Sequence, residues 1–401
     1  MRRFLFVLAL SLILVSSACI SQNQTASSKI TTSESSSSKS STTSIPHQET
    51  TTTPPTTTTP ETAPATSETT ASSSTTTATP QKPETWNMTL VWNVSTVGVP
   101  FMDLNPEGSL GAAIDWNNGI IYLVKPSGES TAFKIWEGEM VQPTISGVAI
   151  KDGVAYVLAK YEEFVGVRKY SWDGKVGEER HGWDGSMPDQ IVRSPSGNHL
   201  CYLVTPDAGK QELYCDGVKI SLKGDEYVLT GVSDTGVVVL TRGDSALIFK
   251  EGSRILGLNT SNVIAYGDKL IASEGNYLKI YDLNGTLLAE KEGYPFKMRT
   301  LIPTGKYIFR NEPLEDTSVL TWNLTEVRTL PGFPEFANEK FVVMRKDDFL
   351  ICYSLMDFHE VFKINAPGSS VKLSDDGKVM LVSDEYGKYW LYKANLPKGE
   401  S

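Results

Sequence analysis

A tight polar turn recurs about every 40 residues along this chain, and it constrains the fold more than any other feature of the sequence. Each turn is followed by an apolar run, a hairpin, a third run that often carries an aromatic residue, and a weaker fourth run. One four-stranded unit cannot bury both of its faces, so neighbouring units must pack around a common axis. The turns occur eight times, as NPEG, IKDG, SPSG, SDTG, YGDK, PTGK, NEK and SDDGK. They predict a ring of eight four-stranded sheets, with seven as the alternative.

The last of these units is one strand short. Its sequence, VKLSDDGKVMLVSDEYGKYWLYKANL, contains only three apolar runs. The segment Met88–Ser95 (MTLVWNVS), in contrast, precedes the first unit and belongs to none. If this segment pairs as the outer strand of the last sheet, the ring closes and no long sheet edge stays open. We therefore expect the N-terminal strand to close the ring.

Residues 86–401 read as one all-β domain. They show no sustained helical period, and neither a linker nor a shift in composition divides them. The period of the turns is that of β-propeller blades. The SPSG and SDDGK turns resemble those of the WD40-like, YVTN and quinoprotein-like propeller families, although full WD dipeptide signatures are absent. The resemblance implies the β-propeller fold but no particular activity, because this fold carries many unrelated functions.

The N-terminus predicts export. Residues 1–18 begin with two arginines, continue with the apolar stretch Phe4–Val15 and end in small residues, which is the order of a signal peptide. The apolar stretch is too short to span a bilayer comfortably. Cys19 follows directly and resembles the lipidated cysteine of a lipobox, although Ser16 stands where that motif usually has leucine. The resemblance implies a lipid anchor on Cys19 at the extracellular face of the membrane; cleavage and release into the medium is the alternative.

Residues 19–85 consist almost wholly of serine, threonine and proline, and we expect them to form a disordered stalk. Such a composition has too little apolar surface to offset the entropy of ordering, about 1 to 2 kcal/mol per backbone residue. Sugars on the hydroxyls would make it an extended mucin-like stalk, and an unmodified flexible tether is the alternative. With the lipobox, this arrangement resembles prokaryotic surface lipoproteins, archaeal ones among them. The candidate N-glycosylation acceptors are Asn23, Asn87, Asn93, Asn259, Asn284 and Asn323.

Two of the four cysteines are placed to form a disulfide. Cys201 and Cys215 flank one predicted hairpin almost symmetrically, so they can face each other across adjacent strands within bridging distance. Two separate buried thiols are the alternative. Cys352 has no partner in the pattern, and we expect it to be a small core residue.

The sequence carries no motif that names a chemistry. His181, His199 and His359, the histidines of the predicted domain, lack metal-ligand spacing, and there is no nucleophile elbow, phosphate-binding loop or EF-hand loop. Four residues could approach the central channel or simply pack, namely Trp183, Arg193, Arg242 and Arg299. We therefore favour a binding or scaffold module for a protein, glycan or peptide, without cofactor. The alternative is an exported enzyme, a lyase, hydrolase or quinone-dependent dehydrogenase, with its site at the channel.

Acidic residues gather at the predicted hairpins between second and third strands. The net charge is −10 and the isoelectric point about 5.1, so nucleic acid is not expected as a partner. We call these carboxylates the acidic rim: Glu162, Glu163, Asp207, Asp244, Glu274, Glu315, Asp316, Asp347, Asp348, Asp384 and Glu385. If the first strand closes the ring, the rim faces away from the stalk, and a cation such as calcium or a basic partner could bind there. The alternative is that the rim is ordinary solvated surface.

Overall fold

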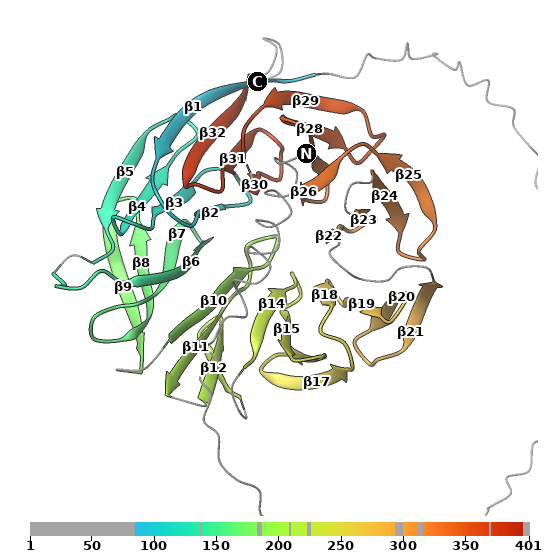
Figure 1. The fold of residues 1–401 in the computed structure, drawn as a ribbon, viewed down its shortest axis with the longest axis horizontal. Helices are drawn as coiled ribbons and strands as arrows, with labels where there is room; N and C mark the ends of the chain where they lie inside the picture. Colours follow the sequence, from blue (N-terminus) through green and yellow to red (C-terminus); the bar gives the residue numbers. More distant parts are fainter. Residues whose placement is uncertain are drawn as a thin grey trace, which may run out of the picture. The chain divides into compact units, whose positions relative to one another are not determined.

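The computed structural model shows an all-β ring of eight four-stranded antiparallel sheets, or blades (Figure 1). It describes residues 85–136, 138–182, 187–207, 210–222, 226–292, 300–311, 316–368 and 370–395. The predicted signal peptide, Cys19 and residues 20–84 of the predicted stalk lie outside these residues. Within them there is no α-helix, and hence none that is long and apolar enough to cross a membrane. The predicted β-propeller of eight blades is confirmed.

The strands of blades 1 to 4 follow in chain order from the axis outward. Blade 1 contains β2 (Phe101–Leu104), β3 (Gly111–Asp115), β4 (Ile120–Val124) and β5 (Ser130–Lys134). Blade 2 contains β6 (Thr144–Lys151), β7 (Val154–Lys160), β8 (Val165–Ser171) and β9 (Gly174–His181). Blade 3 contains β10 (Met187–Arg193), β11 (Leu200–Asp207), β12 (Lys210–Cys215) and β13 (Val218–Ser221). Blade 4 contains β14 (Val228–Val232), β15 (Val237–Arg242), β16 (Ser245–Lys250) and β17 (Ser253–Leu258).

Blades 5 to 7 repeat this order, and blade 8 departs from it. Blade 5 contains β18 (Val263–Tyr266), β19 (Lys269–Glu274), β20 (Tyr277–Asp282) and β21 (Leu287–Glu292). Blade 6 contains β22 (Thr300–Pro303), β23 (Tyr307–Asn311), β24 (Thr317–Thr321) and β25 (Glu326–Leu330). Blade 7 contains β26 (Phe333–Ala337), β27 (Phe341–Lys346), β28 (Phe349–Ser354) and β29 (Glu360–Asn365). Blade 8 contains β30 (Ser370–Leu373), β31 (Val379–Ser383), β32 (Lys388–Asn395) and, outermost, β1 (Asn87–Ser95).

The SxxG turns explain why the repeat is legible in the sequence. In blade 8 the Gly377 amide donates to the Ser374 carbonyl over 2.9 Å, and the Ser374 hydroxyl accepts from the Val379 amide over 3.0 Å. Gly377 has φ +74°, a conformation that glycine adopts without steric cost. The SPSG turn of blade 3 repeats these bonds from Ser194. The serine and glycine therefore fix the turn from the first to the second strand.

The hydrophobic core consists of eight clusters, one between each pair of neighbouring blades. Second strands such as β15 (VVVLTR) are buried on both faces because a blade lies on either side, whereas outer strands such as β21 alternate towards solvent. The cluster between blades 8 and 1 contains Leu104, Val124, Val379, Leu381 and Leu391. The core therefore continues across the point where the ring closes.

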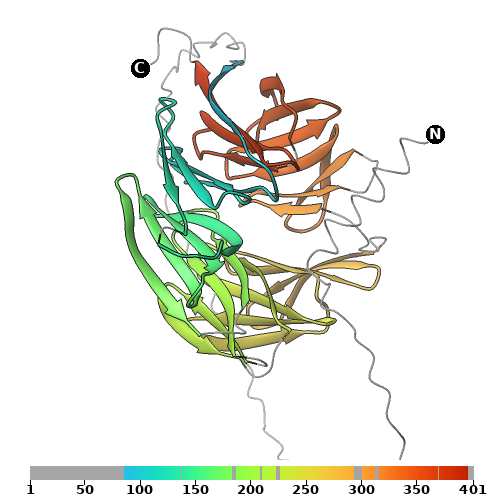
Figure 2. The ribbon, with the colours of Figure 1, turned by 60° about the vertical axis from the view of Figure 1, so that its left-hand side comes forward.

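Strand β1 closes the ring, as predicted. It pairs antiparallel with β32 from Asn87 opposite Asn395 to Ser95 opposite Lys388. Figures 1 and 2 both show the blue β1 beside the red β32. The buried Tyr389 hydroxyl of β32 donates to the Ile114 carbonyl of blade 1 over 2.8 Å. Blade 8 is thus built from the two ends of the domain and is bonded to blade 1.

The ring has two different faces. One, the hairpin face, carries the hairpins between second and third strands and the links between blades. The other, the turn face, carries the turns between first and second and between third and fourth strands. β1 starts on the turn face, where Trp86 donates its amide to the Val361 carbonyl over 2.6 Å and lies against the Gly377 turn. A segment that leads into β1 therefore meets the ring on the turn face.

The predicted disulfide is confirmed. Cys201 of β11 and Cys215 of β12 lie directly opposite each other, with a Cα–Cα distance of 4.1 Å, and their sulfurs are bonded. Cys352 is fully buried between blades 7 and 8, and burial raises the pKa of its thiol well above the ordinary value. It is a core residue, as expected.

Reducing this disulfide is expected to destabilise the domain by about 3 kcal/mol, because it closes a loop of about 15 residues. The two cysteines are 14 positions apart in the sequence, which gives the length of this loop. Urea unfolding with and without a reductant measures the difference, and a Cys201→Ala, Cys215→Ala variant that no longer responds to the reductant is the control. An equal midpoint for oxidised and reduced parent would contradict the prediction.

Candidate functional site

The described residues of the acidic rim lie on the hairpin face, because each belongs to a connection between a second and a third strand or, like Asp207 and Glu274, ends the second strand. The structure does not describe Glu315 or the side chain of Asp207. Of the other rim residues, seven are exposed, and Glu274 and Asp384 are partly buried. The carboxylates therefore face solvent around one end of the ring.

Some rim carboxylates accept hydrogen bonds from nearby backbone amides. Asp384 accepts hydrogen bonds from the Tyr386 and Lys388 amides over 2.9 and 2.8 Å, so it stabilises its own turn. Asp316 accepts from the Gly332 amide over 3.1 Å. In contrast, the side chains of Asp244, Asp347 and Asp348 form no hydrogen bond or ion pair with the described residues. These three carboxylates are therefore candidates for contact with a partner.

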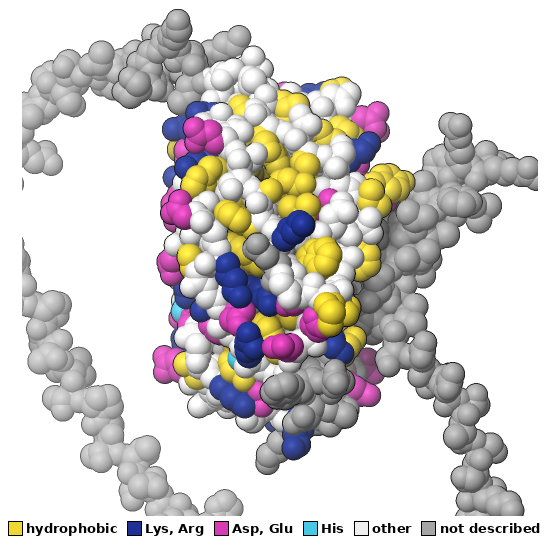
Figure 3. All heavy atoms as spheres, turned by 90° about the vertical axis from the view of Figure 1, so that its left-hand side faces the viewer, with side chains coloured by type: hydrophobic (Ala, Val, Ile, Leu, Met, Phe, Trp, Pro, Cys, Tyr) yellow, Lys and Arg dark blue, Asp and Glu magenta, His cyan; other side chains and the backbone are white. Residues whose placement is uncertain are grey.

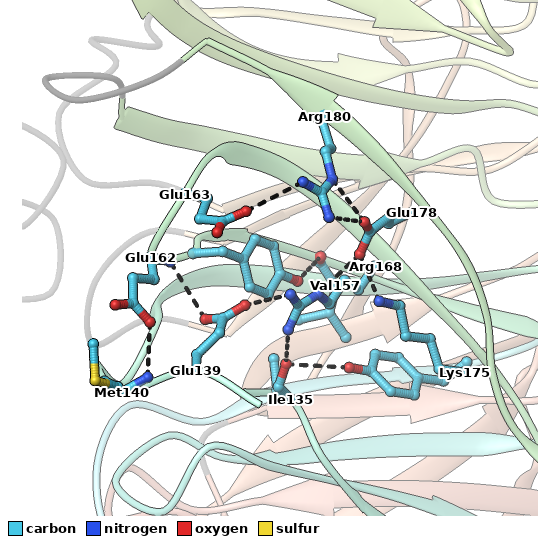
Figure 4. A network of polar contacts seen from close by, with 12 residues as sticks. Ile135, Glu139, Met140, Val157, Glu162, Glu163, Arg168, Lys175, Glu178 and Arg180 are labelled. Carbon is cyan, nitrogen blue, oxygen red and sulfur yellow. Dashed lines mark hydrogen bonds and ion pairs between the residues drawn. The ribbon is translucent and has the colours of Figure 1, made fainter. Parts of the chain in front are cut away.

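The hairpin of blade 2 is held by a network of ion pairs (Figure 4). The buried Arg168 guanidinium donates to Glu139 and to the Ile135 carbonyl, and it lies 4.1 Å from the centre of the Tyr161 ring. Partial burial opposes ionisation of Glu178, but hydrogen bonds from Lys175 and Arg180 outweigh it and lower the pKa of Glu178 to about 2. Arg180 also reaches the rim residue Glu163 over 3.4 Å. Cations of blade 2 thus pair with Glu139, Glu163 and Glu178, whereas the Glu162 carboxylate accepts only from the Met140 amide among the described residues.

On the outer wall of the ring, too, acidic side chains are paired with basic ones. Figure 3 looks at the wall from the side of blades 1 to 3, where basic and acidic side chains are interspersed among hydrophobic ones. Lys169 pairs with Glu179 over 2.5 Å, and Lys219 pairs with Glu212 over 2.5 Å. No broad field of one sign arises from such pairs.

Metal binding at the rim stays a prediction. Among the residues that the structure describes, no three His, Cys, Asp or Glu side chains are grouped so that they could hold a metal ion. Calcium prefers six to eight oxygen ligands, and the exposed hairpins present their carboxylates one or two at a time. A cation would therefore need ligands from outside the described residues or from a partner.

The central channel holds a cavity of about 660 Å³ that opens on the turn face. Inner strands and first turns line it, with apolar side chains such as Val232, Ile264 and Phe336. Lys340 and Lys372 also line it, and neither forms an ion pair with the described residues. This is the concave site where the rival hypothesis places an enzyme.

Arg193 lines the channel, as one alternative predicted, but its guanidinium is already bonded. It donates to both carboxylate oxygens of Asp103 over 2.9 and 3.0 Å and to the Leu104 carbonyl over 3.0 Å. The Asp103 side chain is only 5% exposed and also accepts from the Ile150 amide over 2.7 Å. Arg193 therefore joins blades 1, 2 and 3 and is not free to bind a ligand.

The other channel candidates do not converge either. Arg242 is exposed on the hairpin face, with its guanidinium 5.3 Å from the centre of the Tyr227 ring, while Trp183 and Arg299 lie outside the described residues. No histidine lines the cavity among the described residues.

One group of residues has the composition of a catalytic triad but not its geometry. His199 Nδ1 lies 2.7 Å from Asp216, yet the fully buried Ser194 hydroxyl accepts from the His199 backbone amide. The far side of the imidazole lies against Gly236 of the next blade. The ring nitrogens thus do not face the serine, and the group does not assemble a nucleophile with its base.

Sequence similarity to an archaeal protein identifies the family of this chain. A protein of Archaeoglobus fulgidus described as uncharacterized is 61% identical over 316 residues, which cover 77% of this chain and 90% of that protein. The chain belongs to the family of that archaeal protein. No protein-family model matches the chain.

A solved structure shares the fold with this family member at low identity. The crystal structure of the C-terminal WD40 domain of Sif2 is 10% identical, with a TM-score of 0.55 over 79% of this chain and 100% of that chain. A chain in the crystal structure of a mitotic checkpoint complex has a TM-score of 0.48 at 11% identity, over 82% of this chain and 98% of that chain. The first likeness shows a WD40-like β-propeller fold and nothing about ligands.

All five candidate acceptors within the described residues are exposed, namely Asn87, Asn93, Asn259, Asn284 and Asn323. Asn284 and Asn323 lie in third-to-fourth strand turns on the turn face. Asn259 lies on the hairpin face in the link between blades 4 and 5. Their glycosylation stays a prediction, as do the lipid on Cys19 and the acceptor Asn23, which lie outside the described residues.

Proposed function

We propose that this chain is a lipoprotein displayed on the extracellular face of the cell membrane, where its β-propeller acts as a binding or scaffold module for a protein, glycan or peptide. Export and anchoring rest on residues 1–18, on Cys19 and on the Ser/Thr/Pro-rich residues 19–85. If the lipid is absent, the same module is secreted.

The observation that carries this proposal is the difference between the two faces. On the hairpin face, the carboxylates of Asp244, Asp347 and Asp348 have no partner among the described residues. On the turn face, several lysines are already paired with carboxylates, as Lys151 is with Asp216 over 2.5 Å. β1 starts on the turn face, so the first described residues lie at the end of the ring opposite the hairpin face.

The enzyme alternative is less well supported. The channel cavity is lined by acids and bases such as Asp375 and Lys340, but among the described residues no hydrogen bond joins a nucleophile to a base there, and its arginine is bonded to Asp103. A lyase or hydrolase site needs groups within hydrogen-bond reach of one reacting atom. The channel offers apolar walls and scattered charges instead.

Site-specific photocrosslinking in the native cells tests the proposal. With a photoreactive amino acid at Asp347 or Asp348 on the hairpin face, we expect a discrete crosslinked partner. With the same amino acid at the exposed Asn284 on the turn face, which serves as the matched control, we expect none. Adducts from Asn284 alone, or from no position, would contradict the proposal.

The same cells report on anchoring. A Cys19→Ser protein is expected in the medium instead of the membrane fraction, because it lacks the acylated cysteine. A Cys19→Ser protein that stays in the membrane fraction to the same degree as the parent would contradict lipid anchoring while leaving the binding proposal intact.

A further inference from the structure

The hairpin face carries a group of exposed hydrophobic side chains over blades 8, 1 and 2. We call it the apolar patch, and its members have exposed fractions between 36% and 88%: Val97, Val99, Trp116, Met140, Val141 and Tyr386. Large apolar side chains that gather on a soluble domain, unlike single ones, mark interaction surfaces.

Contacts show that the patch is continuous. The Thr96 amide next to Val97 donates to the Gly387 carbonyl next to Tyr386 over 3.1 Å. A Cβ added at Gly98 would lie only 3.0 Å from the Trp116 indole, so the segment with Val97 and Val99 passes over this ring.

The second half of the patch is joined through hydrogen bonds. The Gln142 side-chain amide donates to the Trp116 carbonyl over 2.7 Å, which brings the neighbouring Val141 to the same place. The Met140 amide donates to the Glu162 carboxylate over 2.7 Å. The members of the patch therefore lie on segments that contact one another from the hairpin of blade 8 to that of blade 2.

Acidic hairpins border the patch at both ends. Residues 160–164 and 384–388 together carry four carboxylates and two lysines. Glu162, Glu163 and Glu385 are exposed. The border is thus negative overall, whereas the centre of the patch is apolar and contains tryptophan, tyrosine and methionine, residues that dominate binding energy at protein interfaces.

Resting on the proposed function, we infer that the apolar patch docks a partner protein through a segment in which apolar and basic side chains alternate. The apolar side chains would cover Trp116 and Val141, and the basic ones would face the acidic hairpins. A second copy of this chain fits poorly as the partner, because the turn-face lysines Lys151 and Lys378 are paired within their own molecule and Lys340 and Lys372 line the channel cavity. An anionic membrane surface would be repelled by the same carboxylates.

Calorimetry on the mature full-length protein with two synthetic peptides tests the inference. One peptide alternates leucine with lysine, and its matched control alternates leucine with glutamate. We expect only the lysine peptide to bind, and Trp116→Ala to weaken its binding about tenfold, the usual loss at a central aromatic contact. A Val97→Ser, Val141→Ser variant changes two exposed side chains of the same surface, and we expect it to weaken binding as well.

A pair of double variants isolates the charge contribution. Glu163→Gln with Glu385→Gln at the border is expected to weaken binding several-fold at low salt and less at high salt. Asp347→Asn with Asp348→Asn changes the same charge on blade 7, and we expect it to leave binding unchanged. No binding of the lysine peptide, equal binding of both peptides, or equal effects of the two double variants would overturn the inference. Crosslinking of a native partner at Asp347 would still support the proposed function, so the two failures can be told apart.

Discussion

Deleting the chain up to Val97 is expected to unfold or aggregate the propeller, whereas deleting it only up to Thr79 is expected to leave its stability unchanged. The longer deletion removes β1, which pairs along β32 from Asn87 to Ser95. It also removes Val91 and Trp92 from the hydrophobic cluster between blades 8 and 1. The remaining β32 would then present an open edge to other molecules.

Thermal unfolding followed by circular dichroism, together with size-exclusion chromatography, measures both deletions. A synthetic peptide that comprises residues 86–97 provides a further control, because it should restore the monomer when added to the longer deletion. If the two deletions unfold at the same temperature, the closure of the ring by β1 contributes nothing to stability and the expectation is wrong.

Replacing Asp103 by alanine is expected to destabilise the domain by about 3 to 5 kcal/mol, the usual cost of removing one partner of a buried ion pair. The substitution leaves the Arg193 guanidinium, whose side chain is 10% exposed, without its carboxylate. It also removes the acceptor of the Ile150 amide. Because these bonds join blades 1, 2 and 3, we expect the whole ring to unfold at lower denaturant concentration.

Urea unfolding measures this loss, and blade 1 offers a matched control. The exposed pair of Lys125 and Glu129 has an N–O distance of 3.9 Å, so Glu129→Ala should cost less than about 1 kcal/mol. An Asp103→Leu, Arg193→Met variant should recover part of the loss, because it removes both buried charges together. Equal unfolding midpoints for Asp103→Ala and Glu129→Ala would refute the proposed importance of the pair.

The fold could be predicted because its signals are local. Serine and glycine at the SPSG and SDDGK turns act within five residues, and each turn is followed by an apolar second strand. The last repeat has only three apolar runs, and the segment Met88–Ser95 belongs to no repeat, so this segment could be assigned as the fourth strand of blade 8. The disulfide was predictable for the same reason, since Cys201 and Cys215 belong to one hairpin.

The surfaces were less predictable because they combine residues from different blades. The sequence places Asp347 and Asp348 on a hairpin, but it does not show which rim carboxylates bind local amides, as Asp384 does. The contact of Asp103 with Arg193 spans 90 residues and has no linear motif. The contact of Trp116 with the link around Gly98 likewise joins residues of different segments and has no linear motif.

The pairing of β1 with β32 in blade 8 has a consequence for how the protein folds during synthesis. Blades 1 to 7 can form one after another as the polypeptide emerges, but β1 finds its partner only after synthesis has passed Asn395. A chain that stops earlier keeps an unpaired strand at each end, a state open to proteases and to other nascent chains. Pairing of the first strand with the last therefore lets only a completed polypeptide become a closed, protected ring.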